Sequence, residues 1–140
     1  MIEIDTITNF NNNSKSSTLS SLNFNCLPKL TLINQEFEVL VSFESNEDFV
    51  LNIDVSLELD IAFLKKEIKL LTTKESISKG KNFFPIKLNS LKLDNYEENE
   101  LMNISVLKIK LSNKELGIFK EKVIIIQAIK DKGLIYKNLI

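Results

Sequence analysis

The chain has 140 residues, of which 44% are hydrophobic, and its formal net charge is −1. This length suits one ordinary domain with its own core, so we expect a single domain over residues 1–140. Histidine, arginine and tryptophan are absent and Cys26 is the only cysteine, which excludes intramolecular disulfides and sites built on histidine. The N-terminal stretch "MIEIDTITNF" has neither the basic start nor the apolar stretch typical of a signal peptide, which favours an intracellular protein or a piece of a longer one. No apolar run approaches the roughly 20 residues of a membrane-spanning helix, so we expect a cytoplasmic protein that does not insert into membranes.

Strand patterns begin at the N-terminus. The stretch "IEIDTITNF" places isoleucine at positions 2, 4 and 7 and predicts a short strand, whereas the polar residues 11–21, "NNNSKSSTLSS", predict a flexible loop. The strongest signal is "FVLNIDVSLELDI", residues 49–61, which is apolar at every odd position. Thirteen residues exceed the usual strand length, so we expect this strand to bend, bulge or end near Leu59.

The segment 60–72 changes period. Ile61, Leu64, Ile68 and Leu71 recur at spacings of three and four, and Asp60 precedes them as a possible N-cap, which is typical of a short helix. The same residues also fit a loop followed by a strand, "EIKLLT". Both structures remain open for this segment.

Three further strands are predicted in the second half. In "ISKGKNFFPIKL", Pro85 lacks an N–H, so this strand should lie at a sheet edge or begin at the proline. In "LMNISVLKIKLS" the apolar phase slips between Val106 and Leu107, which predicts a β-bulge. The stretch "KVIIIQAIK" is apolar on both sides and should be central in a sheet or covered on both faces.

Together these patterns predict an all-β protein, an antiparallel two-sheet sandwich of about seven strands with one short helix possible near 60–72. The stretches "LPKLTLINQEFEVLVSFESNEDFVLNIDVSLEL" and "ISKGKNFFPIKL" resemble the opening strands of immunoglobulin-like and fibronectin-like sandwich domains, over about residues 27–129. The chain lacks the cysteine pair and core tryptophan of antibody domains. The resemblance implies an immunoglobulin-like sandwich that binds proteins or sugars, or acts as a spacer in a larger assembly.

Charged clusters offer three candidate sites. Asp54, Glu58 and Asp60 lie in one row of the long strand, in which alternate positions are about 6.8 Å apart. Residues 94–100 form an acidic loop, and lysines are frequent over 65–81. Calcium sites usually gather their ligands in a tight turn that contains glycine, whereas a flat strand places carboxylates in a line and the acidic loop has no glycine. The lysines have few aromatic neighbours on which nucleic-acid bases could stack. We therefore interpret all three as solvated surfaces, and expect no catalytic residue, no metal, no cofactor and no nucleic acid. Cys26 is expected to pack as a small hydrophobic residue.

The best functional candidates are apolar and lie near the C-terminus: Val123, Ile124, Ile125, Ile126, Leu134, Ile135 and Tyr136. They either complete the core or leave a strand edge and an apolar patch for another chain. We therefore predict a non-enzymatic interaction or structural module of a larger assembly, which binds a protein partner or itself through an edge strand and this apolar segment. The alternative is a carbohydrate-binding sandwich that uses the outer polar faces, with Tyr96 or Tyr136 exposed beside the carboxylates.

Overall fold

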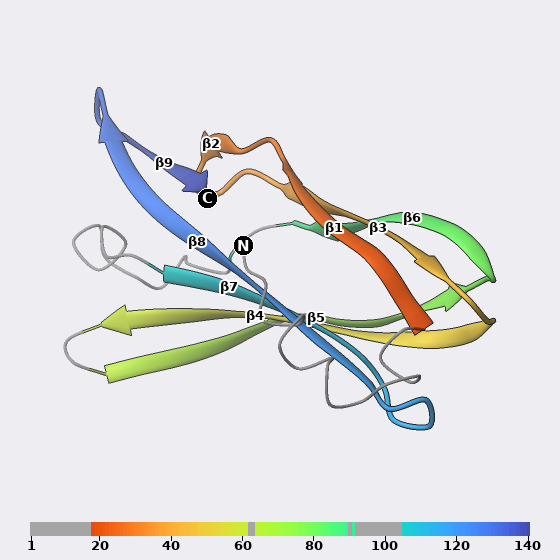
Figure 1. Ribbon diagram of the computed structural model, residues 1–140. Helices are drawn as coiled ribbons and strands as arrows, with labels where there is room; N and C mark the ends of the chain where they lie inside the picture. Colours follow the sequence, from red (N-terminus) through yellow and green to blue (C-terminus); the bar gives the residue numbers. More distant parts are fainter. Residues whose placement is uncertain (1–17, 62–63, 90, 92–104) are drawn as a thin grey trace.

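The computed structural model describes residues 18–61, 64–89, 91 and 105–140, which form two antiparallel sheets (Figure 1). The strands in these ranges are β1 (Leu19–Leu27), β2 (Leu30–Leu32), β3 (Phe37–Ser45), β4 (Phe49–Ile61), β5 (Leu64–Ile77), β6 (Gly80–Leu88), β7 (Ser105–Asn113), β8 (Ile118–Asp131) and β9 (Leu134–Leu139). The predicted all-β, two-sheet architecture is confirmed. The strand predicted within residues 2–10 and the acidic loop 94–100 lie outside the described residues.

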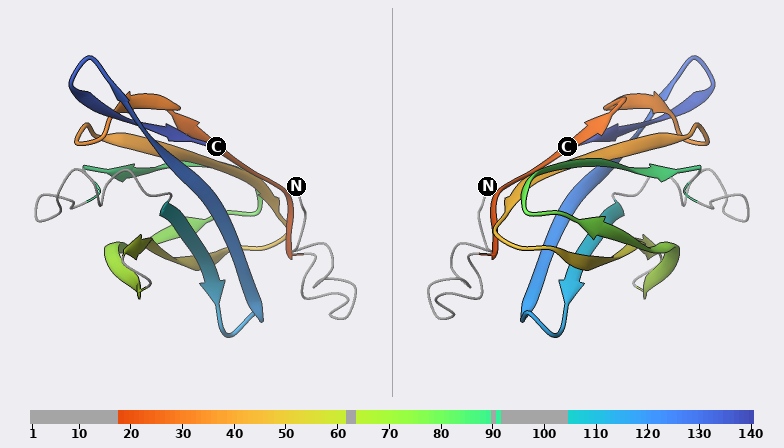
Figure 2. Two further views of the ribbon diagram at one scale, coloured as in Figure 1. Left: turned by 90° about the vertical axis from the view of Figure 1, so that its left-hand side faces the viewer. Right: turned by 90° about the vertical axis from the view of Figure 1, so that its right-hand side faces the viewer.

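The two sheets differ in size. The smaller sheet has the order β1-β3-β6, and the larger has the order β2-β9-β8-β7-β4-β5. Figure 2 shows that the larger sheet is strongly twisted and that β8 crosses the molecule as one long strand. The edge position predicted for the strand with Pro85 is confirmed, because β6 ends the smaller sheet. Pro28 and Lys29 separate β1 from β2, so the chain changes sheets at that point.

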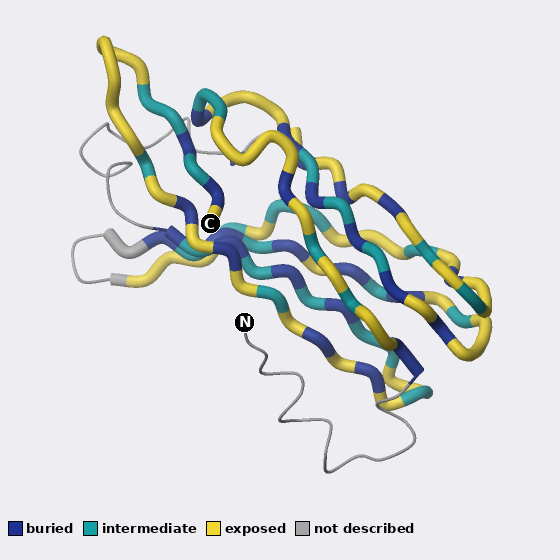
Figure 3. Tube along the Cα trace, turned by 45° about the horizontal axis from the view of Figure 1, so that its top comes forward, coloured by how far each residue is buried: buried dark blue, intermediate teal, exposed yellow. Residues whose placement is uncertain are grey.

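The core lies between the sheets and is built by alternate residues of the long strands (Figure 3). Strand side chains alternate between the two faces, so an apolar residue at every second position forms a continuous inner surface. The main buried side chains are Phe37, Val39, Val41 and Phe43 of β3, Leu51, Ile53, Val55, Leu57 and Leu59 of β4, and Leu107, Ile109 and Leu111 of β7. The rings of Phe43 and Phe84 join β3 to β6 edge to face, with centroids 6.1 Å apart.

The described residues of the segment 60–72, which are 60–61 and 64–72, are strand rather than helix. β5 pairs with the whole of β4, from Phe49 opposite Ile77 to Ile61 opposite Leu64. A register shift falls opposite Val55 and Ser56, where Leu70 is the extra residue on β5. This bulge produces the spacing of three between Ile68 and Leu71. Leu64 and Ile68 are four apart because Lys66 occupies the inward position between them, and Ile61 lies on β4, opposite Leu64. The long ladder offered by β4 decides the conformation, because pairing outweighs local pattern in short segments.

Two expectations about strand boundaries and bulges are wrong. β7 pairs with both β4 and β8 without a register shift, so the predicted bulge near Val106 is not there. Val106 is an apolar residue on the outward face, and this placement, not a slip in register, breaks the apolar pattern. The polar stretch 11–21 is not entirely loop, because β1 begins at Leu19. Ser21 has a φ of 56° and lies within a register shift between Ser20 and Asn23.

Candidate functional site

The outward face of the larger sheet carries a group of apolar side chains over β8, β9 and β2. In one row, Val106 lies opposite Ile125, which exchanges two backbone hydrogen bonds with Ile140. In a second row, Ile129 lies opposite Tyr136, which lies opposite Leu32. Residues directly opposite on neighbouring strands share a face, so these rows form one surface. We name it the outer apolar face and define it by Leu30, Leu32, Val106, Val123, Ile125, Ile129, Leu134, Tyr136 and Ile140.

The side chains of this face are accessible in the described structure. Their exposed fractions include 36% for Ile129, 51% for Leu134 and 68% for Ile140. Gln127 and Asn138, which lie opposite one another within the face, are polar but uncharged. The middle of the outer apolar face, between its two apolar rows, therefore carries no charge.

The predicted interaction residues divide between the two faces of the sheet. Val123, Ile125, Leu134 and Tyr136 belong to the outer apolar face, with Tyr136 half-buried. By contrast, Ile124 and Ile126 are buried in the core, and Ile135 is half-buried against it.

Strand periodicity explains this division, since a run of apolar residues must supply both faces of a strand. Sequence reasoning missed the residues of β2, whose place beside β9 depends on the fold. It also missed Ile129 on β8, which the alternation from Phe119 onward could have indicated.

Lys137 of β9 points inward, away from the outer apolar face, and is completely buried. Its Nζ donates hydrogen bonds to the carbonyl oxygens of Leu32 at 2.8 Å, Ile33 at 3.0 Å and Gln35 at 2.6 Å. The Nζ also lies 4.9 Å from the centre of the Phe37 ring. An ammonium has three donors, and here each of them has a backbone acceptor. Lys137 thus fastens β9 to the turn between β2 and β3.

Burial lowers the pKa of Lys137 from its ordinary value of 10.5 to about 8. Between these two values the folded chain has released the proton while the unfolded chain still holds it, so the free energy of unfolding should rise with pH across this window. Below pH 8 both states are protonated and the cost of burying the charge is fully present. Urea unfolding near each end of the window measures the effect, with the Lys137→Met variant as reference because it lacks the titrating group. A pH-independent difference between the two chains would contradict this prediction.

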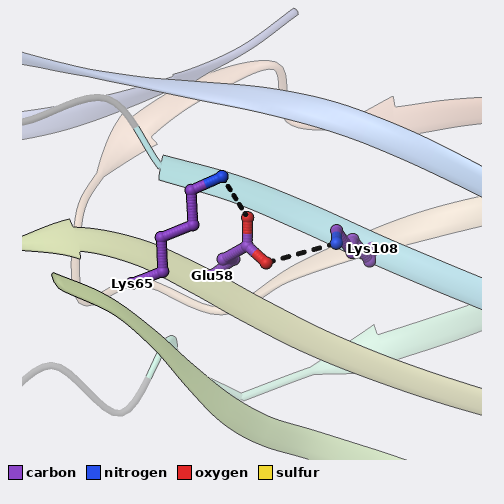
Figure 4. A network of polar contacts seen from close by, with 3 residues as sticks. All are labelled: Glu58, Lys65 and Lys108. Carbon is purple, nitrogen blue, oxygen red and sulfur yellow. Dashed lines mark hydrogen bonds and ion pairs between the residues drawn. The ribbon is translucent and has the colours of Figure 1, made fainter.

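The polar residues of β4 line the outward face of the same sheet, beyond β7. Glu58 accepts a hydrogen bond from Lys108 Nζ at 3.2 Å and lies 3.9 Å from Lys65 Nζ (Figure 4). The hydrogen bond to Glu58 raises the pKa of Lys108. Asp54 accepts a hydrogen bond from Thr72 Oγ1 at 3.0 Å and lies opposite Lys110.

In the described structure these two carboxylates are thus engaged with partners on neighbouring strands rather than turned toward one another. This arrangement fits a solvated surface on which carboxylates contact lysine and threonine side chains of neighbouring strands, and Glu58 also lies opposite Glu67 of β5. Exposed ion pairs of this kind stabilise a fold only slightly.

The remaining candidates offer little chemistry. Among the described residues, no cluster of three or more acidic or cysteine side chains could hold a metal ion. Burial raises the pKa of the Cys26 thiol, which opposes formation of a nucleophilic thiolate. The described part of the chain also has no helix long and apolar enough to cross a membrane.

The fold and these surfaces define the chain as an all-β protein of two antiparallel sheets with an apolar outward face. The sequence matches no protein-family model, and no curated protein is detectably similar to it.

Proposed function

We propose that this protein is a non-enzymatic interaction module that binds a partner protein through the outer apolar face. The observation that carries the proposal is the pair of apolar rows, Val106–Ile125–Ile140 and Ile129–Tyr136–Leu32, on an accessible surface. The charged residues Lys108 and Asp131 lie at its margin, opposite Val123 and Leu134. Contiguous apolar surfaces of this kind mark sites where proteins meet. The flat geometry of a sheet face suits another protein surface, whereas small molecules usually bind in concave sites.

Strand order supports an immunoglobulin-like module. With strands lettered as in immunoglobulin domains, β1, β3 and β6 take the places of A, B and E in one sheet, and β4, β7 and β8 take those of C, F and G in the other. β5 lies beside β4 in the place of C′. β9 and β2 extend the second sheet beyond β8, and they carry about half of the outer apolar face. Domains of this architecture commonly present their binding surfaces on one sheet or at one edge.

The variant Ile125→Glu tests the proposal, because it places a charge at the centre of the outer apolar face. Ser76→Glu is the matched control, since Ser76 is exposed on the same outward side at the far edge of the sheet. We expect tagged wild-type protein and Ser76→Glu to retain a common protein partner from their native cells. Ile125→Glu should retain it roughly tenfold less or worse.

Circular dichroism and the thermal midpoint establish that each variant is folded. Light scattering on the purified chain separates self-association from binding of a different protein. Equal retention by Ile125→Glu and the wild type would refute docking through this face.

A carbohydrate is the second candidate ligand for the same face. Tyr136 lies there with the amide side chains of Gln127 and Asn138 nearby, which is the combination of ring and amide groups that binds sugars. Only one ring is available among the described residues of this face, so protein docking is better supported. Titration with oligosaccharides, with Tyr136→Ala as the comparison, distinguishes the two ligands.

A further inference from the structure

The edges of the two sheets are protected unequally. In the larger sheet, β2 has three residues and β5 carries Lys65, Lys66, Lys69 and Lys74. In the smaller sheet, β6 carries Pro85 between Lys81 and Lys87. Short length, lysine and proline are the usual means by which proteins prevent strands from adding to an edge. β1, by contrast, has nine residues and no charge, with the sequence LSSLNFNCL.

The second half of β1 is regular enough to accept another strand. From Asn23 opposite Ser42 to Leu27 opposite Glu38 it pairs with β3 in unbroken register. Among the described residues no strand pairs with its other side. In a regular strand, alternate backbone N–H and C=O groups point away from the existing partner, so this edge offers donors and acceptors to an incoming strand.

Positive charge lies near this edge strand. The charges of Lys29 and Lys122 both act on the thiol of Cys26, an inward-facing residue of β1. Lys29 lies two residues after the end of β1, and Lys122 is on the inward side of β8, opposite Ile109. Neither lysine forms an ion pair within the described part of the chain. The acidic residues of β8, Glu121 and Asp131, lie on the outward face, opposite Lys110 and Leu134.

We propose that β1 binds an extended segment of a partner protein as an added strand, and that this segment carries acidic side chains facing Lys29 and Lys122. Inward-facing positions of the added strand would meet these lysines. The outward-facing positions of the added strand would continue the outward surface of β1, which is formed by Asn23, Asn25 and Leu27. Threonine or valine suits these outward-facing positions. The bound segment is therefore one in which acidic residues alternate with threonine or valine.

A second copy of this chain fits the same edge poorly. Pairing β1 with β1 would bring the lysines of both copies to one junction, and β1 has no acidic residue to oppose them. The site is also separate from the outer apolar face, so it goes beyond the proposed function and does not depend on it.

The probe for this site is a short synthetic peptide that alternates glutamate with valine and carries a fluorophore. We expect fluorescence anisotropy to show binding that weakens as salt is raised, since salt screens exposed charges. Lys122→Glu and Lys29→Glu should each weaken binding roughly tenfold or more. Lys74→Glu, on the opposite edge strand β5, is the matched control and should leave binding unchanged.

Amide hydrogen exchange locates the bound peptide. We expect new protection in β1 between Asn23 and Leu27, and slower labelling of the Cys26 thiol. Protection on β2, β5 or β6 instead, equal binding of a peptide with lysine in place of glutamate, equal effects of Lys122→Glu and Lys74→Glu, or no binding would each overturn the proposal. Ile125→Glu should bind this peptide normally, so the test separates this site from the outer apolar face.

Discussion

Replacing Lys137 with alanine is expected to lower the free energy of unfolding by about 2–4 kcal/mol. The substitution removes a fully buried side chain and leaves the carbonyl oxygens of Leu32, Ile33 and Gln35 without their donor. Unsatisfied buried acceptors and the space left by the aliphatic stem both destabilise the folded state. Urea unfolding followed by circular dichroism measures the change.

Lys74→Ala is the control for this substitution, because Lys74 is exposed on the edge strand β5. Its effect should stay within about 0.5 kcal/mol, as for most surface substitutions. Hydrogen exchange in Lys137→Ala should show the largest loss of protection in β2 and β9, the strands that Lys137 holds together. If Lys137→Ala and Lys74→Ala were equally mild, the ammonium would contribute little to fastening β9.

Replacing Leu107 with alanine is expected to cost about 2–5 kcal/mol of unfolding free energy, the usual range for a buried leucine. Leu107 has no exposed surface and lies between Leu57 of β4 and Ile124 of β8 on the inner face of the larger sheet. Truncation removes apolar contacts at the centre of the core and leaves a cavity, because the paired backbones on both sides limit relaxation. Chemical unfolding again provides the measurement.

Val106→Ala is the matched comparison, since Val106 is the adjacent residue and faces outward between Glu58 and Ile125. Its cost should be below about 1 kcal/mol, because the half-buried side chain leaves no enclosed cavity. Comparing the free energies of unfolding of these two variants therefore shows which face of β7 packs against the core. Similar losses at both positions would mean that the two faces of β7 are covered alike.

The stability of β9 has a consequence for the proposed function. Only Lys137 and Leu139 of this strand are buried, yet β9 supplies Leu134 and Tyr136 to the outer apolar face. β9 is thus fastened largely by hydrogen bonds from one lysine and by backbone pairing with β8 and β2. Variants of Lys137 are expected to weaken partner binding indirectly, by loosening half of the docking surface.

The sequence by itself determined the fold class and the core face of the central strands. Alternation in residues 49–61 identifies Leu51, Ile53, Val55 and Leu57 as core, because a strand repeats every two residues and only one of its faces is buried. Pro85 likewise predicts an edge strand, because it cannot donate a ladder hydrogen bond. The sequence also located the apolar segment near the C-terminus, although not which of its residues face outward.

Only the tertiary structure decided the features that depend on partners distant in the chain. Residues 64–77 form a strand because β4 offers them a ladder, and the bulge at Leu70 produces the helix-like spacing of three between Ile68 and Leu71. The outer apolar face requires β2 to lie beside β9, a pairing across more than a hundred residues that no local pattern indicates. From the sequence alone Lys137 would be taken for an ordinary surface lysine, but the end of β2 and the turn after it supply three carbonyl oxygens that make its burial possible. Local periodicity sets which residues can form strands, whereas pairing sets which face each strand buries and which it leaves for other molecules.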